Sequence, residues 1–340
     1  MRAEEVAPGS FIWRDAGRVV VFRAGGIEGA PRLLAENGLA PFELLSTPRH
    51  LDAAAALASA AAALHEVATG GVPEAAASLL GSIRSPSLVA LGGGRVIDAA
   101  KAVAAVTGAT VAAIPTTMSG AEMTGIHRLP AGAEGRARGM VRPSLVIGDP
   151  GAMTSAPEAE LRLSSMNALA HGADSLYTPF ANPVSRMTAL RGAELIATAL
   201  DEAPDERNRT PLALGSILCG YAIDSGMFAI HHVICQTLVR VCGTPHAGTN
   251  AAILPRAMAF MTSRAPAELA SLAEAIGTVP DQIESRILAL GGNPPGLGDQ
   301  GGDKSKLPQA IDAILQRPEL SFAPEPPTRS DLEQLIEAAW

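Results

Sequence analysis

Four polar residues in the second half of the chain have types and a spacing that could support chemistry. Asn167 and His171 are four positions apart, so they would share one face of a helix. His232 and His246 follow in later helical stretches and could converge on them. One amide and three imidazoles resemble the ligands of a divalent-metal site in which the single anionic ligand is replaced by the neutral amide of Asn167. We predict that these four residues are catalytic and that no metal is bound.

The imidazoles among them are suited to proton transfer, because histidine titrates near neutral pH. We expect the rings of His232 and His246 to face a cleft and not the core, so that replacing either one changes stability little. The separate histidines His50, His65 and His127 are predicted to be surface or packing residues.

A glycine triplet follows a buried apolar run and precedes a helix. The run at 87–91 is predicted to be a strand, and the helix is predicted from Val96 to about Val106. Glycines let the backbone approach a pyrophosphate, and the free N–H groups at a helix start favour anions. The triplet is not a GxGxxG fingerprint, so the fold need not be a standard Rossmann domain. The predicted cofactor-binding residues are Ser46, Thr47, Gly92, Gly93, Gly94, Arg95, Asp98, Thr116 and Thr117.

Two positions leave the form of the cofactor open. Arg95 could clamp a phosphate, block the site by its bulk, or lie on the surface as a solvated side chain. The strand that ends at Ser46 and Thr47 lacks the acidic residue that would bind an adenosine ribose diol, and Arg49 could attract a 2′-phosphate. The expected cofactor is therefore NADH or NADPH.

The elements that position these residues divide the chain into two parts. Up to about residue 155, short apolar runs alternate with helical stretches, which is typical of a parallel sheet covered by helices. Later residues form long helical stretches rich in alanine and leucine. We predict an α/β dinucleotide-binding domain over 1–155 and an all-helical substrate domain over 156–340. The predicted strands are 18–22, 42–45, 87–91, 110–114 and 145–147, and an alanine-rich helix is predicted over 53–64.

Composition argues against several classes of function. The 340 residues carry a net charge of -8, and only 3% of them are aromatic. Such a composition provides neither the positive charge nor the aromatic side chains expected of a protein that binds nucleic acid or an anionic membrane. The charged segment 1–5 lacks the apolar region of a secretory signal, and no run reaches the ~20 apolar residues of a membrane span. Cys219, Cys235 and Cys242 form no CxxC pair and are predicted to be buried reduced thiols. We expect a soluble, cytoplasmic protein.

Several segments resemble the iron-containing alcohol dehydrogenase superfamily. The stretch from Gly92 to Lys101 is similar to its GGGSxxDxAK motif, and the stretch from Ile114 to Thr124 to its PTTxxGSE element. The resemblance covers nearly the whole chain and, within the superfamily, points to maleylacetate reductases. The segments that carry this second similarity are 45–48, 71–73, 165–171, 181–183, 231–235 and 338–340.

The resemblance implies a dehydroquinate synthase-like fold, with a nucleotide-binding α/β domain, an all-α domain and an active site in the cleft between them. Metal-dependent members place an aspartate and three histidines where Asn167, His171, His232 and His246 stand. Maleylacetate reductases carry asparagine at the first position and are regarded as working without a metal. By this analogy the four residues line the substrate pocket, where the histidines bind a carboxylate or supply a proton while the nicotinamide delivers hydride. A small-molecule substrate and a homodimer are expected.

Departures from the pattern of the superfamily fall on the cofactor and substrate contacts. Arg95 replaces a small serine, and Ala121 replaces the serine of the GSE element. Gln236 stands where the reductases have a second histidine, and Asn250 replaces the histidine of their PHAETH stretch. Residues 321–326 lack the proton-donating tyrosine and the carboxylate-binding arginine of their C-terminal pattern.

Three functions remain open at the level of sequence. The leading prediction is a metal-independent NAD(P)H-dependent reductase of a small carbonyl or enone, similar to maleylacetate reductase. The departures at Arg95 and near the C-terminus favour a non-redox acid/base catalyst, such as a dehydratase, isomerase or cyclase. A catalytically silent binding subunit is the third possibility, and the intact trio His171, His232 and His246 argues against it.

Overall fold

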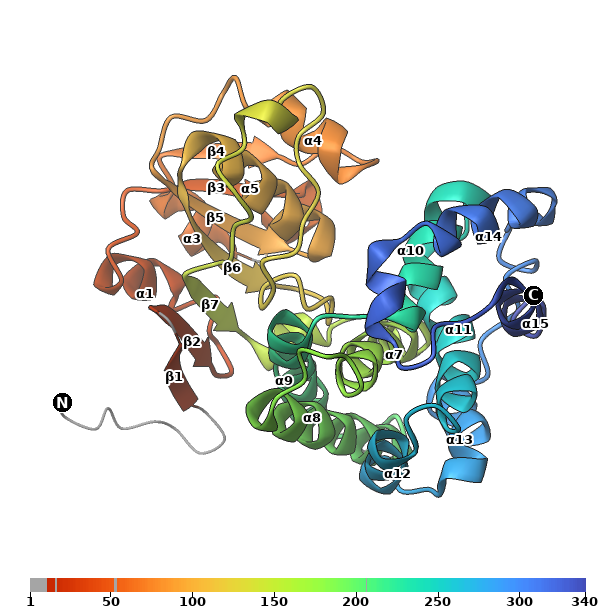
Figure 1. Cartoon of the computed structure of the whole chain (residues 1–340). Coiled ribbons are helices and arrows are strands. Elements are labelled where there is room, and N and C mark those ends of the chain that lie inside the picture. Colours follow the sequence, from red (N-terminus) through yellow and green to blue (C-terminus); the bar gives the residue numbers. More distant parts are fainter. Residues whose placement is uncertain (1–10, 16, 52–53, 206) are drawn as a thin grey trace. The chain divides into compact units, whose positions relative to one another are not determined.

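The computed structural model describes residues 11–15, 17–51, 54–205 and 207–340. The segment 1–5, on which the prediction about a secretory signal rests, lies outside them. The chain forms two compact units, Met1–Ser155 and Ala156–Trp340, which are coloured red to yellow and green to blue in Figure 1.

A largely parallel sheet of seven strands forms the centre of the described part of the first unit (Figure 1). Its order is β1-β2-β7-β6-β5-β3-β4, and every neighbouring pair is parallel except β1 with β2. The carboxyl ends of β3, β4, β5 and β6 therefore meet at one edge of the sheet. The strands are β1 (Phe11–Asp15), β2 (Arg18–Phe22), β3 (Glu43–Ser46), β4 (Ala63–Glu66), β5 (Ser87–Gly92), β6 (Thr110–Pro115) and β7 (Leu145–Gly148).

Helices cover both faces of this sheet. Because successive strand residues point to opposite faces, Leu44 packs with α1 and α3, whereas Leu45 packs with α4 and α5. The same alternation separates Val89 from Ala90 on β5. Each fully buried leucine contributes roughly 1.5–3 kcal/mol through removal of apolar surface from water. The helices are α1 (Ala30–Glu36), α2 (Pro48–Leu51), α3 (Ala55–Ala60), α4 (Val72–Leu79), α5 (Gly94–Thr107), the 3-10 turn η2 (Glu134–Arg136) and α6 (Pro150–Met153).

The prediction of a helix over 53–64, of which residue 53 lies outside the described residues, is wrong for 61–64. Helix α3 ends at Ala60, and Ala63–Glu66 forms strand β4, which pairs in parallel with β3. An edge strand half exposed to solvent has no continuous apolar run, and pairing with β3 overrides the helix propensity of alanine. His65 is fixed there by Glu43, whose Oε2 lies 2.7 Å from its Nε2.

The second unit contains no strand in residues 156–205 and 207–340. Proline at the first turn starts several of its helices, and α8 also has a capping box in which Asn182 and Ser185 bond to each other's backbone. Its helices are α7 (Glu158–Ser175), α8 (Pro183–Asp201), α9 (Thr210–Gly226), α10 (Ile230–Cys242), α11 (His246–Met261), α12 (Pro266–Ala275), α13 (Ile283–Leu290), α14 (Leu307–Leu315) and α15 (Arg329–Glu337), with 3-10 turns η3 (Pro280–Gln282), η4 (Lys304–Lys306) and η5 (Pro318–Phe322).

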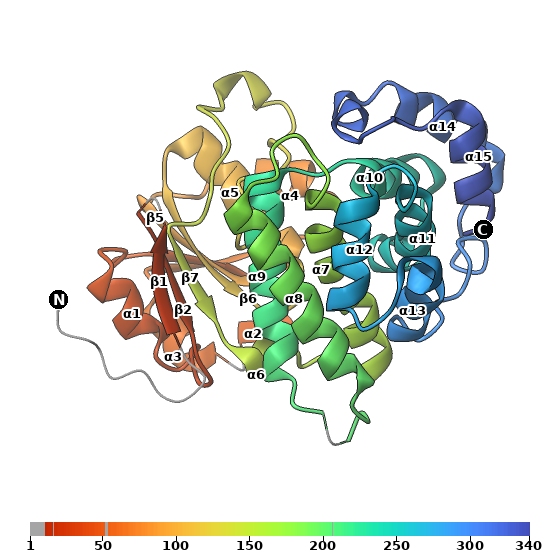
Figure 2. The ribbon, with the colours of Figure 1, turned by 60° about the horizontal axis from the view of Figure 1, so that its bottom comes forward.

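Helices α7, α8 and α9 pack against one another at very close range (Figure 2). A Cβ atom added to Gly192 would lie 2.6 Å from Sγ of Cys219 and 2.9 Å from the carbonyl oxygen of Gly215. A Cβ atom on Gly172 would lie 2.9 Å from the same sulfur. Only glycine fits at these crossings, and the resulting contact holds α7 firmly in place.

The three cysteines are free thiols and all are buried, as the sequence predicts. None of the described helices is by itself both long and apolar enough to cross a membrane; the sharply bent pair α9 and α10 passes by length and composition only.

Candidate functional site

A cavity of about 470 Å³ opens in the first unit where the parallel strands end. Its walls include Thr47–His50 after β3, Glu66 at the end of β4, Gly93–Arg95 at the start of α5, and Thr117 after β6. This is the place predicted for a nucleotide, at the carboxyl edge of a parallel sheet.

The glycines at this edge are held tightly against the loop after β6. A Cβ atom on Gly93 would lie 3.1 Å from Oγ1 of Thr117, and one on Gly94 would lie 3.0 Å from Cβ of Ser119. The backbone is therefore bare at the start of α5, a helix of 14 residues whose first N–H groups have no intrahelical partner. Such a cradle fits the pyrophosphate of a dinucleotide.

Three charged side chains line the cavity without a partner in the described chain. Arg95 has a buried Nε atom with no hydrogen-bond partner. No hydrogen bond or ion pair joins the side chains of Arg49 or Glu66 to another described residue. The cavity thus offers two guanidinium groups and one carboxylate to a ligand.

Other predicted cofactor residues lie behind the walls. The hydroxyl of Ser46 donates to the backbone carbonyl at the end of β5 at 2.8 Å. Asp98 accepts from Nζ of Lys101 at 2.8 Å, and Oγ1 of Thr116 lies 3.3 Å from Nε2 of His50. These residues support the cavity and do not line it, and His50, predicted to be a surface or packing residue, does line it. The predicted residues outside the lining are Ser46, Gly92, Asp98 and Thr116.

Lys101 is fully buried and ties the loop after β6 to α5. Its ammonium group donates to the carbonyl oxygens of Ala121 at 3.0 Å and Ile126 at 2.8 Å, besides Asp98. Since this loop includes Ser119, which packs on Gly94, one buried cation fixes the shape of the cradle.

In the second unit, α7 and α10 bring two of the predicted histidines together. The rings of His171 and His232 are stacked, with centroids 5.1 Å apart and planes 18° apart. Asn167 lies one turn before His171 on α7, and all three side chains are buried. His246 begins α11 and is exposed. His232 is only 6% exposed, so of the two rings expected to face a cleft it is the more deeply buried.

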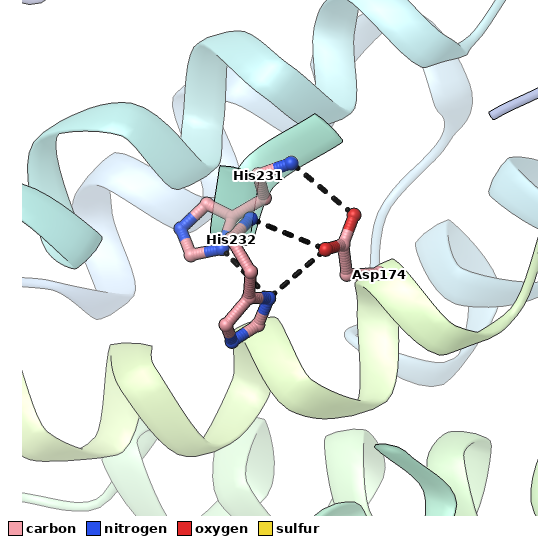
Figure 3. A group of neighbouring side chains, drawn as sticks. All are labelled: Asp174, His231 and His232. Carbon is pink, nitrogen blue, oxygen red and sulfur yellow. Dashed lines mark hydrogen bonds and ion pairs between the residues drawn. The ribbon is translucent and has the colours of Figure 1, made fainter. Parts of the chain in front are cut away.

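Asp174 is the residue of this cluster that the sequence reasoning missed (Figure 3). Its Oδ2 accepts hydrogen bonds from the backbone N–H of Ala229 at 2.9 Å, the backbone N–H of His232 at 3.2 Å, and Nδ1 of the His232 ring at 2.9 Å. Its Oδ1 accepts from the N–H of His231 at 3.3 Å and from the hydroxyl of Tyr177. The signal in the sequence was a lone acid three positions after His171, on the same helix.

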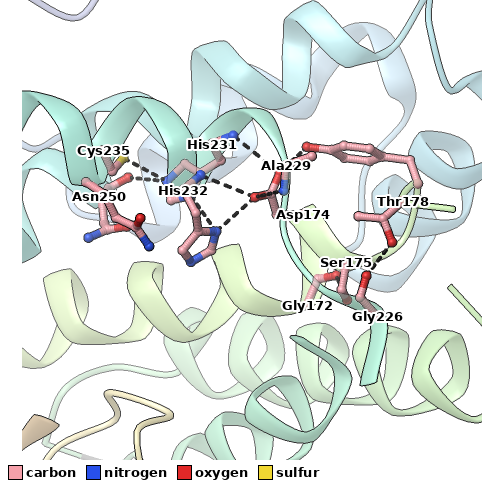
Figure 4. Close-up of polar contacts among 12 residues, drawn as sticks. Gly172, Asp174, Ser175, Thr178, Gly226, Ala229, His231, His232, Cys235 and Asn250 are labelled. Atoms are coloured by element: carbon pink, nitrogen blue, oxygen red, sulfur yellow. Dashed lines mark hydrogen bonds and ion pairs between the residues drawn. The ribbon is translucent and has the colours of Figure 1, made fainter. Parts of the chain in front are cut away.

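The acceptors around the two imidazoles of α10 fix their tautomers (Figure 4). The carbonyl oxygen of Asn250 accepts from Nε2 of His231 at 3.3 Å, so Nδ1 of that ring carries a lone pair. The carboxylate of Asp174 can only accept, so Nδ1 of His232 carries the proton. Nε2 of His232 is thereby left as a buried lone pair without a hydrogen-bond partner, and Nδ1 of His171 also has none.

Burial and charge set the protonation states of the cluster. Burial favours the neutral form of Asp174, but the hydrogen bond and the positive charge of His232 outweigh it and hold the pKa of Asp174 below its usual range. Burial, followed by the charge of His232, lowers the pKa of His231 to about 3 and that of His171 well below its usual value. Asp174 is therefore anionic and these two imidazoles are neutral at pH 7.

Two of the departures from the superfamily are engaged in hydrogen bonds. Gln236 lies one turn after His232 on α10, and its Oε1 accepts from Nη2 of Arg317 at 3.1 Å. Arg317 is also paired with both oxygens of Glu319. Asn250 donates from Nδ2 to the carbonyl oxygen of His246 at 2.8 Å. Since a guanidinium only donates, the NH₂ group of Gln236 is turned away from Arg317.

The carboxylate of the cluster is already occupied by hydrogen-bond donors of the protein. Among the described residues, the ligand atoms that approach within 4.8 Å of one another belong to Asp174, His231 and His232. Both oxygens of Asp174 already accept N–H or O–H groups, and this carboxylate faces Nδ1 of His232, not its unpartnered Nε2. The trio His171, His232 and His246 forms no such group, and Asn167 offers no negative charge.

Comparisons with known proteins agree with this architecture. Residues 162–340 match the C-terminal part of the Fe-containing alcohol dehydrogenase family, and residues 27–157 match the iron-containing alcohol dehydrogenase model. The chain is 35% identical to maleylacetate reductase 1 of Rhodococcus opacus, over 79% of this chain and 77% of that protein. It is 36% identical to maleylacetate reductase 2 of Cupriavidus pinatubonensis, over 76% of each. The crystal structure of maleylacetate reductase from Agrobacterium tumefaciens superposes with a TM-score of 0.84 at 29% identity, over 97% of each chain.

Proposed function

The chain belongs to the iron-containing alcohol dehydrogenase family, and on that premise we propose that it is an NAD(P)H-dependent reductase of a small carbonyl or enone that works without a metal. The observation that carries the proposal is the bare glycine cradle at the start of α5, with the unpartnered guanidinium of Arg95 beside it. Together they supply backbone N–H groups and a positive charge for a pyrophosphate.

The nicotinamide, when bound, supplies hydride to the electrophilic carbon of the substrate. The chain must then place one proton on the oxygen or carbon that becomes basic. His232 is the proposed donor in its doubly protonated form, with the transferred proton on Nε2, which has no partner in the described chain, while Asp174 holds Nδ1. An anionic partner stabilises the imidazolium that carries the proton, as in other carboxylate–histidine pairs. His171, held neutral and stacked on His232, is proposed to orient the substrate.

We propose a reaction without a metal because of the side chains that would have to bind one. A dication surrounded by neutral imidazoles and an amide lacks the charge that a carboxylate ligand would give it. The one nearby carboxylate, that of Asp174, is saturated by five donors from Tyr177, Ala229, His231 and His232. Proton transfer from His232 replaces the metal as the means of stabilising charge on the substrate oxygen.

The substrate is proposed to be a small carbonyl or enone, as the name maleylacetate reductase suggests for the relatives. Their own substrate is not carried over, because Gln236 and Asn250 change the polar groups beside the histidines. Gln236 presents an amide, which does not titrate, where the relatives are expected to have an imidazole. The chain is further proposed to act in the cytoplasm as a homodimer.

A non-redox acid/base catalyst is the second candidate. The observation that favours it is Arg95, whose side chain stands at the cradle where the family has a small serine. If its bulk excludes the pyrophosphate, the pair of His232 and Asp174 could still carry out dehydration, isomerisation or cyclisation.

A cofactor titration decides between these functions. We expect purified protein to bind NADH or NADPH with micromolar affinity by calorimetry and to quench or shift the fluorescence of the reduced nicotinamide. Single-turnover oxidation of the bound cofactor by a panel of small oxo acids and enones then tests the chemistry. Absence of any binding by both nucleotides would rule out the reductase.

A further inference from the structure

We propose that Arg49 recognises a 2′-phosphate, so that the nucleotide selected by the cavity of the first unit is NADPH and not NADH. This inference rests on the proposed function, because it assumes that a dinucleotide occupies the cavity. It adds the residue that distinguishes between the two forms of the cofactor.

Strand order places Arg49 where the adenosine ribose must lie. The pyrophosphate is held after β5, and β3 is the neighbouring strand on the side away from β6. In a parallel dinucleotide-binding sheet, the ribose of the adenosine lies above the end of that neighbouring strand. The chain leaves β3 through Ser46 and Thr47 and reaches Arg49 within three residues, and Arg49 lines the cavity.

The charges at this end of the cavity favour an added phosphate. Arg49 has no hydrogen bond or ion pair with another described side chain, so its guanidinium is available to a ligand. A guanidinium binds a phosphate through paired, charge-assisted hydrogen bonds, whereas a ribose diol is usually bound by a carboxylate. Among the described residues that follow β3, 47–51, none carries a carboxylate.

Glu66 is the competing residue, since it also lines the cavity and is also unpaired. It ends β4, which lies one strand further from β5 than β3 does. At the usual strand spacing, β4 lies about 10 Å from β5, whereas β3 lies about 5 Å away. Glu66 therefore follows a strand that lies further from the pyrophosphate cradle than the strand that leads to Arg49.

His50 does not change this balance. Burial, followed by the charge of Arg49, lowers the pKa of His50, so its ring is neutral at pH 7. Its Nε2 faces Oγ1 of Thr116 at 3.3 Å, so this contact turns that nitrogen toward the wall. The discrimination between the two nucleotides therefore falls on Arg49 and Glu66.

The test compares two pairs of ligands that differ only by the phosphate: NADPH with NADH, and adenosine 2′,5′-bisphosphate with AMP. Calorimetry on the parent protein should show the phosphorylated member of each pair binding about 10- to 100-fold more tightly, the range of one charge-assisted contact. In Arg49→Gln this ratio should fall to near one, while the affinity for AMP stays the same.

Two further variants make the result specific. Arg128→Gln, an exposed arginine of the same unit outside the cavity, should keep the parental ratio. Glu66→Gln should keep or increase it. A parent that binds NADH as tightly as NADPH, or a Glu66→Gln variant that loses NADH selectively, would overturn the inference and leave the reductase intact. A parent that binds neither nucleotide would instead contradict the proposed function itself.

Discussion

Asp174 caps a helix that it does not belong to, and through the same oxygen it holds His232. The residue at the start of α10 is Ala229, which has no side chain able to bond to the free N–H groups of the first turn. Oδ2 of Asp174, from the end of α7, accepts the N–H of Ala229 and lies 2.9 Å from Nδ1 of His232. A negative charge at this position is also favoured by the dipole of α10. The carboxylate of Asp174 thus orients both the start of α10 and the ring of His232.

Replacement of this carboxylate should be costly. Asp174→Asn keeps the size of the side chain but removes the charge and one acceptor, and we expect a loss of about 3–5 kcal/mol in the free energy of unfolding, as for one member of a buried ion pair. Urea denaturation measures the loss. Asp281→Asn, at an exposed position on η3, should lie within about 0.5 kcal/mol of the parent. Equal stability of both variants would mean that the contacts of Asp174 contribute little.

The lowered pKa of Asp174 predicts how the difference in stability between the parent and Asp174→Asn depends on pH. The pKa of Asp174 is lower in the folded chain than the value of about 3.9 expected when it unfolds. Its contribution is therefore complete above about pH 4 and is lost as the pH falls below that value. The difference in unfolding free energy between the parent and Asp174→Asn should be constant from pH 5 to 8 and become smaller below pH 4. A difference that grows on acidification would contradict the sign of the shift.

The alanine variants of His232 and His246 should behave differently from each other. His232→Ala leaves the buried Asp174 without one charge-assisted bond, which costs about 1.5–3 kcal/mol of stability. His246 is exposed, so His246→Ala should change stability by less than about 1 kcal/mol. In the proposed role of general acid, His232→Ala should also lower the rate of reduction by roughly 10²–10⁴-fold. Thermal melting and turnover, measured on the folded fraction, separate these effects; full turnover in His232→Ala would remove it from the mechanism.

Asn167 provides a test of the metal hypothesis. The parent is expected to contain well under one equivalent of iron or zinc by elemental analysis. Asn167→Asp restores a negative charge on the helix face of His171 and should increase the affinity for zinc by at least about tenfold. Asn208→Asp, at an exposed site before α9, serves as the control and should gain nothing. One tightly held metal per chain in the parent would contradict the prediction.

Arg95→Ser tests whether Arg95 binds the pyrophosphate or excludes the nucleotide from the glycine cradle by its bulk. If Arg95 holds the pyrophosphate, its removal should weaken NAD(P)H binding by about 1.5–3 kcal/mol. If its bulk fills the site, the variant should bind a nucleotide that the parent does not. Calorimetry on both proteins gives opposite signs for these two cases.

Much of the architecture was readable from residue patterns. The strands over 18–22, 87–91, 110–114 and 145–147 each contain a continuous apolar run of at least three residues, and a parallel sheet covered on both faces requires such runs. The mixed segment 63–66 could not be recognised, because an edge strand needs only one buried face and its pairing with 43–46 is not part of any local pattern. The helix propensity of its alanine-rich surroundings favoured a helix there.

The histidine cluster was predictable in part and for a physical reason. Asn167 and His171 share a helix face, which spacing reveals. Asp174 is different, because its role depends on the start of another helix 55 residues later, the separation of the bond to Ala229. The tautomer of His232 and the pairing of Gln236 with Arg317 depend on similar distant contacts, so no local pattern contains them.

At the crossing of α7, α8 and α9, the thiol of Cys219 can report when these three helices separate. Sγ of Cys219 sits against Gly172 and Gly192 with no room for a larger neighbour, and burial raises the pKa of its thiol to about 12. An alkylating reagent can reach this sulfur only when the three helices separate. The rate of labelling at Cys219 therefore follows the opening of the scaffold beneath the histidines, and ligands that tighten that scaffold can be found by the labelling they slow.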